Sequence, residues 1–148
     1  MANVRIFVET TWNRPSIQDG MAMYLVEHMS GDIPITRQGF VHLKDGTETK
    51  ATLMALINAF HILKKPCSAA VNVTNTTVIN TLSNHWLPIW KKDGWKKANG
   101  KPVKNEDLWQ MFLDKTENHT YSIETGHHEY REIMQMHLRE EMEKWEHE

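Results

Sequence analysis

The chain contains one cysteine, Cys67, among its 148 residues. A single thiol excludes an internal disulfide and any metal site that needs several thiolates. Cys67 lies between a predicted helix and a predicted strand, a position that favours a buried and unreactive side chain.

Long apolar runs are also absent. No segment approaches the roughly 18 to 20 consecutive apolar residues that span a bilayer, and residues 1–14 lack the basic-then-apolar pattern of a secretory signal. We therefore expect a soluble, cytoplasmic protein. The chain has no low-complexity break, so we expect one domain, residues 1–148, large enough to bury roughly 70% of its unfolded surface.

Several catalytic motifs are missing. There is no glycine-rich phosphate loop and no nucleophile elbow, which leaves nucleotide hydrolysis and acyl transfer without support. His128 and Glu132 are four residues apart, but no HExxH pattern or thiolate partner accompanies them. Because the chain has nine histidines, such a pairing is a weak sign of a transition-metal site.

The net charge is only −2, yet one segment is strongly basic. Residues 91–104 hold six lysines against one acid, Asp93, and tryptophans 86, 90, 95 and 109 are interleaved with them or flank them. Lysines neutralise phosphates, and indole rings stack on bases or sugars. The alternative is a solvated lysine-rich helix whose tryptophans are ordinary core residues.

The first half of the chain predicts three strands and a helix. Alternation marks strands over residues 3–9, 21–28 and 35–43, with a hairpin turn at 30–32. In the first strand, Glu9 shares a face with Phe7, opposite Val4. Helical spacing covers residues 49–63.

The second half predicts one strand covered on both faces, at 69–73, and helical or irregular chain from about 75. Asn105 is typical of a helix cap, with acids following it in the first turn. A last strand is expected at 119–124, and an amphipathic helix from about His128 to the end of the chain.

The segment from Trp86 to Trp109 closely resembles the basic protrusion of bacterial-type ribonuclease H, which cuts RNA in RNA–DNA hybrids. The tryptophans at 86, 90, 95 and 109 have that family's spacing. Weaker similarity extends from residues 4–7 through 53–57 to Gly126-His127. The resemblance implies the ribonuclease H fold, an α/β protein whose five-stranded mixed sheet is flanked by helices in the order βββαβα..βα. It also implies a basic protrusion at about 86–104.

The same resemblance locates the family's active site. These enzymes hydrolyse RNA with two Mg²⁺ ions held by four acids, and this chain departs from that set. Glu9 stands at the position of the first-strand aspartate, and Thr52 replaces the glutamate of the first helix. Thr74 stands at the fourth-strand aspartate, with Asn75 as the alternative if the alignment shifts by one residue.

The fourth acid and the loop histidine lie near the C-terminus. The preceding loop is shorter than usual, so the alignment of the last acid is ambiguous. Glu132 is the best match and Glu129 the second. His127 matches the histidine that assists product release or proton transfer. We expect Glu9 to be a surface or partly buried acid at a sheet edge, paired with Arg131 or a lysine.

These departures predict a ribonuclease H-like pseudoenzyme that binds an RNA–DNA hybrid or another duplex without efficient cleavage, because neutral hydroxyls do not replace anionic ligands of Mg²⁺. No cofactor is expected. The family positions that we single out are Glu9, Thr52, Thr74, Glu132 and His127, and the nucleic-acid-binding candidates are Trp86, Trp90, Lys91, Lys92, Lys96, Lys97 and Lys101.

Two alternatives stay open. A divergent active ribonuclease H would need Mg²⁺ or Mn²⁺ on a cluster rebuilt from Glu9, Glu132 and Glu129, with Asp19 or Glu48. A protein-interaction scaffold on the same fold would use the tryptophan-rich surface or the C-terminal helix to bind a protein partner or a second copy. Residues 129–148 hold seven acids against three basic residues, a net charge of −4 that repels phosphate.

Overall fold

The structure is a computed structural model that describes all 148 residues. Five strands form one mixed sheet in the order β3-β2-β1-β4-β5. The strands are β1 (Ala2–Thr10), β2 (Gln18–Ser30), β3 (Ile33–Gly46), β4 (Cys67–Asn72) and β5 (Thr120–Glu124). The helices are α1 (Glu48–His61), α2 (Thr76–Ser83), α3 (Trp86–Lys92), α4 (Glu106–Thr116) and α5 (Arg131–Glu146). The predicted fold class and order of elements are confirmed.

The first three strands form an antiparallel meander, and β4 and β5 join the sheet in parallel beside β1. Ser30 pairs with Ile33, so only Gly31 and Asp32 form the hairpin turn. Gly31 has a φ of 62°, a conformation that costs glycine little. The turn lies where the sequence predicted it.

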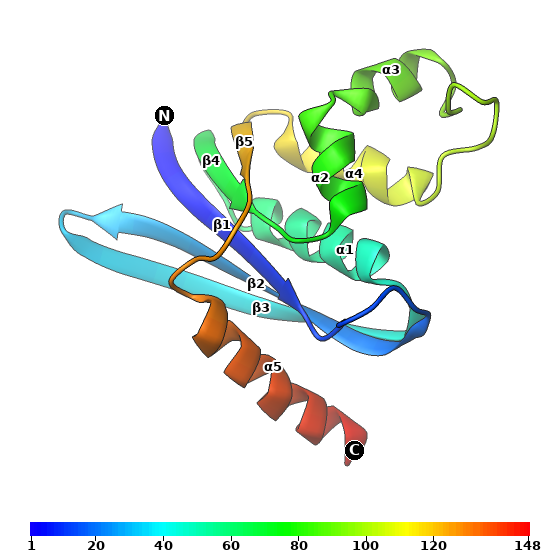
Figure 1. The fold of residues 1–148 in the computed structure, drawn as a ribbon. Coiled ribbons are helices and arrows are strands. Elements are labelled where there is room, and N and C mark those ends of the chain that lie inside the picture. The colour runs from blue at the N-terminus through cyan, green and yellow to red at the C-terminus, as the bar shows by residue number, and fades with distance from the viewer.

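Helices cover both faces of the sheet. Figure 1 shows α1, α2 and α4 on one face and α5 alone on the other. Val4, Ile6 and Val8 point into the large core under α1, while Phe7 packs with Met134 and Leu138 of α5 in a smaller cluster. Because strand residues alternate between faces, Glu9 lies on the α5 side with Phe7, as predicted.

The strand β4 is less enclosed than the sequence predicted. Its residues Cys67, Ala69 and Val71 are buried against the large core, but Ser68 and Ala70 are only half-buried. The reason is that α5 runs over β1 and β2 and does not reach this part of β4. Cys67 is buried as expected, and burial raises the pKa of its thiol.

Two helix starts differ from the sequence prediction. Asn105 precedes α4 but has a left-handed backbone (φ 58°) and makes no side-chain hydrogen bond to the helix, so it is not the predicted side-chain cap. The last helix begins at Arg131, three residues after His128, because the His128 side chain contacts Glu9 in the loop before the helix. That helix, α5, is the longest at 16 residues, and none of the helices has the length and apolarity to cross a membrane.

Candidate functional site

Glu9 lies near the end of β1, the central strand, and is only 3% exposed. Its Oε2 atom is 2.9 Å from Nε2 of His128, and its Oε1 atom accepts a hydrogen bond of 2.9 Å from Nε2 of Gln135. Nε of Arg131 lies 3.5 Å from the same Oε1. The expected partner Arg131 is confirmed, but the expectation of a surface or partly buried acid at a sheet edge is wrong, because Glu9 is fully buried on the central strand. Both carboxylate oxygens are engaged by groups of the protein itself.

His128 is fixed on two sides. Its ring stacks on Phe7 with centroids 4.5 Å apart, and its Nδ1 accepts the backbone N–H of Tyr130 at 3.2 Å. A ring nitrogen that accepts carries no proton, so the proton sits on Nε2 and is donated to Glu9. The sequence analysis singled out the neighbouring His127 and treated His128 only as a weak candidate for a metal ligand.

A second charged network holds the loop between β5 and α5, residues 125–130, against the sheet. Arg5 Nε and Nη2 donate to the Glu27 carboxylate at 2.8 and 2.7 Å, and its Nη1 donates to Glu129 at 2.7 Å. The Tyr130 hydroxyl also donates to Glu27. The segment before α5 is therefore tied to β1 and β2 at two consecutive residues, Glu129 and Tyr130.

The network shifts the protonation of its members. Hydrogen bonds from Arg5 lower the pKa of Glu27 and of Glu129, and the Glu27 carboxylate raises the pKa of Tyr130 to about 12. The same carboxylates raise the pKa of Arg5. At neutral pH, Arg5, Glu27 and Glu129 are charged while Tyr130 stays protonated, which is the state that all these hydrogen bonds require.

The other positions implied by the resemblance, together with Glu9, include no group of three histidine, cysteine, aspartate or glutamate side chains that could hold a metal ion. Thr52 is 1% exposed and its hydroxyl has no partner, while Thr74 follows β4 as an exposed residue. Glu132 and His127 are exposed and make no side-chain hydrogen bond or ion pair.

The donors present do not fit a pair of divalent cations. Nowhere do three histidine, cysteine, aspartate or glutamate side chains converge so that they could hold a metal ion. Mg²⁺ takes oxygen ligands in near-octahedral geometry, usually with one or two carboxylates. Here Glu9, the one acid on the central strand, already has both oxygens bound by its neighbours.

A second polar cluster forms where β1 ends and α1 begins, and the sequence gave no direct sign of it. Glu48 accepts hydrogen bonds from the Thr10 hydroxyl at 2.7 Å and from Nδ2 of Asn75 at 3.1 Å. Asn75 is buried and also caps α2, since its Oδ1 accepts the N–H of Val78 at 3.0 Å. Asn75 therefore has a structural role that accounts for its burial.

The other acids that a divergent active ribonuclease H would need, Asp19 and Glu129, are also bound by groups of the protein. Asp19 accepts the backbone N–H of Asp45 at 2.8 Å, and Glu129 is bound to Arg5. No three of these acids converge with one another or with Glu9 in a group that could hold a metal ion.

The basic protrusion, residues 86–104, comprises α3 and the loop after it, and Figure 1 shows it projecting beyond the sheet. The loop is braced by backbone hydrogen bonds, including Trp95 N to Trp90 O at 2.7 Å and Val103 N to Trp95 O at 3.1 Å. None of its six lysines forms an ion pair, and all six are exposed: Lys91, Lys92, Lys96, Lys97, Lys101 and Lys104.

Trp86 and Trp90 lie on the inner side of the protrusion. Their rings are 5.7 Å apart between centroids and tilted by 40°, and Trp86 is 38% exposed. Trp109, at the start of α4, is 2% exposed and packs on Phe112. Of the tryptophans that the sequence placed in this region, Trp109 is thus a core residue and Trp86 is available at the surface.

Comparison with known proteins agrees with this architecture. A profile of the RNase H family matches residues 3–131. The chain belongs to the RNase H family. The family suggested by the tryptophan spacing and by the strand and helix segments is therefore confirmed.

Bacterial proteins named ribonuclease H are similar over part of their length. The one from Stutzerimonas stutzeri is 41% identical over 88 residues, which is 56% of this chain and 58% of that protein. The one from Chlorobium luteolum is 35% identical over 105 residues, or 70% of this chain and 65% of that protein. The chain spans about half to three-fifths of the length of the first curated relatives it matches.

Solved structures share the fold at low sequence identity. LC9-RNase H1, described as a type 1 RNase H with the type 2 active-site motif, superposes with a TM-score of 0.71 at 19% identity, covering 87% of this chain and 64% of that chain. The foamy viral protease-reverse transcriptase in complex with RNA/DNA hybrid gives a TM-score of 0.60 at 18% identity, covering 84% of this chain and 17% of that chain.

Proposed function

We propose that this chain is an RNase H-fold protein that binds duplex nucleic acid, foremost an RNA–DNA hybrid, and does not cut it efficiently. The observation that carries the proposal is the state of Glu9. Its carboxylate is buried and both oxygens are taken by His128 and Gln135. A metal ion would have to displace these partners from the centre of the protein before it could bind.

Binding is supported by the charge distribution. The basic protrusion has six unpaired lysines and a single acid, Asp93. Its excess of positive charge can neutralise the phosphates of a nucleic-acid backbone. The acidic helix α5 lies on the opposite face of the sheet, where it does not oppose a duplex at the protrusion. The foamy viral relative in fold was solved with an RNA/DNA hybrid, which supports the choice of ligand.

Weak cleavage is supported by the neutral positions. Thr52 and Thr74 offer hydroxyls where the family resemblance implies carboxylates, and Glu132 lies exposed and belongs to no group of three side chains that could hold a metal ion. Two-metal hydrolysis needs ligands that hold both ions on opposite sides of the reacting phosphate. We further propose that residues 1–148 act as one domain, because α5 packs on β1 and β2 and so unites the two ends of the chain.

A divergent active ribonuclease H is the second candidate. It is favoured by the bacterial relatives, which are named ribonuclease H and are 35 to 41% identical over the matched segments. On this alternative, Mg²⁺ or Mn²⁺ binding would rearrange Glu9 away from His128 and bring Glu48 or Glu132 toward it.

One preparation of protein can test both. Affinity for a labelled RNA–DNA hybrid is measured over a series of salt concentrations, and cleavage of the same hybrid is followed with Mg²⁺ and with Mn²⁺. We expect binding that weakens steeply with salt, and no cleavage beyond that of a Glu9→Gln protein purified identically. Binding that is absent or independent of salt would reject the first part. Cleavage that Glu9→Gln abolishes would establish the active alternative.

A further inference from the structure

The β2–β3 hairpin leaves one edge of the sheet open. β3 is the outermost strand and pairs only with β2, and its first six residues, 33–38, are all exposed. The other outer strand, β5, has 5 residues against 14 in β3. Figure 1 shows the tip of the hairpin projecting away from the helices. A long, uncovered edge strand presents unpaired N–H and C=O groups to another chain.

Apolar side chains are exposed along this edge. Met29, Ile33 and Ile35 are each at least 41% exposed, although residues of these types are usually buried. Because strand residues alternate between faces, Ile33 and Ile35 share the face on which Val41 enters the large core. The edge therefore combines open backbone groups with apolar side chains that a further strand would cover.

The hairpin shows which backbone groups of β3 are open. Ser30 and Ile33 flank the two-residue turn, and residues in that position exchange hydrogen bonds within the hairpin. Every second residue after Ile33 therefore bonds to β2. The residues between them have N–H and C=O groups that point outward: Pro34, Thr36, Gln38, Phe40 and His42. Pro34 agrees with this assignment, because proline has no N–H to donate to β2.

We propose that β3 pairs antiparallel with β3 of a second copy of this chain, about a two-fold axis at Gln38. Gln38 then lies opposite itself, and residues at equal distances from the axis lie opposite one another. Outward residues face outward residues, which allows roughly eight backbone hydrogen bonds between the copies. Such a two-fold interface uses the same surface on both copies and closes on itself, so association stops at the dimer.

Apolar side chains are matched in this arrangement. Ile35 lies opposite Val41 of the second copy, and Ile33 lies opposite Leu43. Val41 belongs to the large core and Leu43 packs against it, so the two exposed isoleucines extend a core that already exists. Cross-strand apolar pairs of this kind stabilise a sheet.

The charged side chains of the edge are matched as well. Asp32 lies opposite Lys44 of the second copy, and Arg37 lies opposite Gly39. The ring of Tyr24 covers Gly39, where an added Cβ would be 2.6 Å from the ring, so Arg37 of one copy meets an aromatic face of the other. None of Asp32, Arg37 and Lys44 has an ion-pair partner within the chain.

Neighbouring alignments lose these matches. An axis at Arg37 places the two Arg37 side chains opposite each other, and like charges in that position destabilise a sheet. An axis at Gly39 places Arg37 opposite Val41 and Lys44 opposite Pro34. Charges that guard an edge strand against pairing in general are thus compensated in one alignment only.

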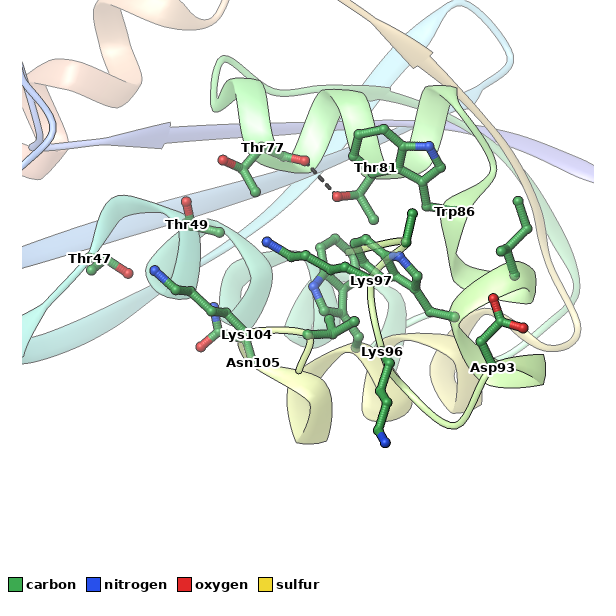
Figure 2. A pocket seen from close by; sticks show the side chains of 15 residues that line it. Thr47, Thr49, Thr77, Thr81, Trp86, Asp93, Lys96, Lys97, Lys104 and Asn105 are labelled. Atoms are coloured by element: carbon green, nitrogen blue, oxygen red, sulfur yellow. Dashed lines mark hydrogen bonds between the residues drawn. The ribbon is translucent and has the colours of Figure 1, made fainter. Parts of the chain in front are cut away.

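The paired edge is separate from the nucleic-acid candidates. Figure 2 shows the hollow beside the basic protrusion, and none of its lining residues belongs to β3. The inference goes beyond duplex binding and does not depend on it.

Self-association is measured by sedimentation velocity of the intact protein without nucleic acid, from about 1 to about 100 μM. We expect a reversible monomer–dimer equilibrium within this range. Lys44→Asp should weaken it about tenfold, because two acids then face each other at both ends of the interface. Asp32→Lys together with Lys44→Asp exchanges the signs and should return the dissociation constant to within about threefold of the parent value.

Lys64→Asp is the matched control. It makes the same change of charge at an exposed residue beyond α1 and should leave the dissociation constant within about twofold. Thermal melting shows that each variant is folded. A monomer throughout the concentration range, or equal losses in Lys44→Asp and Lys64→Asp, would overturn the proposal.

Cysteine cross-linking tests the axis. In Gln38→Cys the two new thiols are on residues whose Cα atoms are about 5.5 Å apart, within the reach of a disulfide. In Thr36→Cys the new thiols are offset along the strands by about 13 Å. Cys67 is buried and does not compete. We expect mild oxidation to give a covalent dimer of Gln38→Cys and to leave Thr36→Cys monomeric. Equal cross-linking of both, or of neither, would contradict this pairing.

Discussion

Glu9 and the basic protrusion handle charge in opposite ways. The Glu9 carboxylate is 3% exposed and is matched on both oxygens by His128 and Gln135. The six lysines of the protrusion are exposed and have no partner within the chain. A buried charge must be paired internally to be tolerated, while exposed charges cost little and remain available. We therefore expect Glu9 to contribute to stability and the protrusion lysines to contribute to binding.

Replacing Glu9 tests this assignment with the largest expected effect. Glu9→Ala leaves the Nε2–H of His128 without its acceptor inside the protein, and leaves the Gln135 amide with only the backbone oxygen of Thr10, at 3.2 Å. We expect the free energy of unfolding to fall by about 3 kcal/mol, measured by urea denaturation.

The sign of that change separates the two accounts of Glu9. Carboxylates held together for metal binding repel one another without the metal, so their removal commonly stabilises a protein. A Glu9→Ala protein as stable as the parent, or more stable, would contradict a structural role. Glu132→Ala is the control, because this exposed acid has no partner and its loss should change stability by less than about 0.5 kcal/mol.

Removing protrusion lysines should affect binding and not stability. Lys91→Gln with Lys92→Gln should weaken affinity for an RNA–DNA hybrid about tenfold at low salt, and reduce the slope of log affinity against log salt by about 2. Lys64→Gln with Lys65→Gln, two exposed lysines beyond α1, removes the same charge elsewhere. If both pairs weakened binding equally, attraction would come from net charge and not from the protrusion.

The Arg5–Glu27 network predicts a smaller effect that depends on pH. The pKa of Glu27 is lowered in the folded protein, so its contribution is present above its ordinary value of 4.5 and is lost as the pH falls through the folded value. Glu27→Gln should therefore cost about 1 kcal/mol at pH 7 and nothing in strong acid. Urea midpoints over a series of pH values measure this, and a pH-independent difference would mean that lost packing is responsible.

Asn105 gives the smallest predicted change. Because its backbone is left-handed and its side chain caps nothing, Asn105→Gly should leave stability unchanged or raise it, while Asn105→Ser should cost about 0.5 kcal/mol. A side-chain cap would give the reverse order, since serine also caps well. Thermal melting of the two variants distinguishes these cases.

Much of the fold followed from local pattern. Alternation in the first strand placed Glu9 and Phe7 on one face, and helical spacing located α1, because both signals depend on neighbouring residues. The family resemblance also came from a contiguous segment, the basic protrusion. Such features need no knowledge of distant contacts.

The surroundings of Glu9 were not predictable in the same way. Its partners His128 and Gln135 are 119 and 126 residues away in sequence, and the shortened loop before α5 obscured which of its residues face the sheet. Asn75 and Asn105 illustrate the same limit at shorter range. Both are typical cap residues, yet only Asn75 caps a helix with its side chain, while Asn105 has a left-handed backbone and makes no side-chain hydrogen bond to α4.

The most direct test of the central claim is a crystal of the protein soaked in Mn²⁺, with anomalous scattering recorded around the centre of the sheet. The account predicts no manganese beside Glu9, whose carboxylate stays bound to His128 and Gln135. A pair of manganese peaks in contact with Glu9 would contradict it.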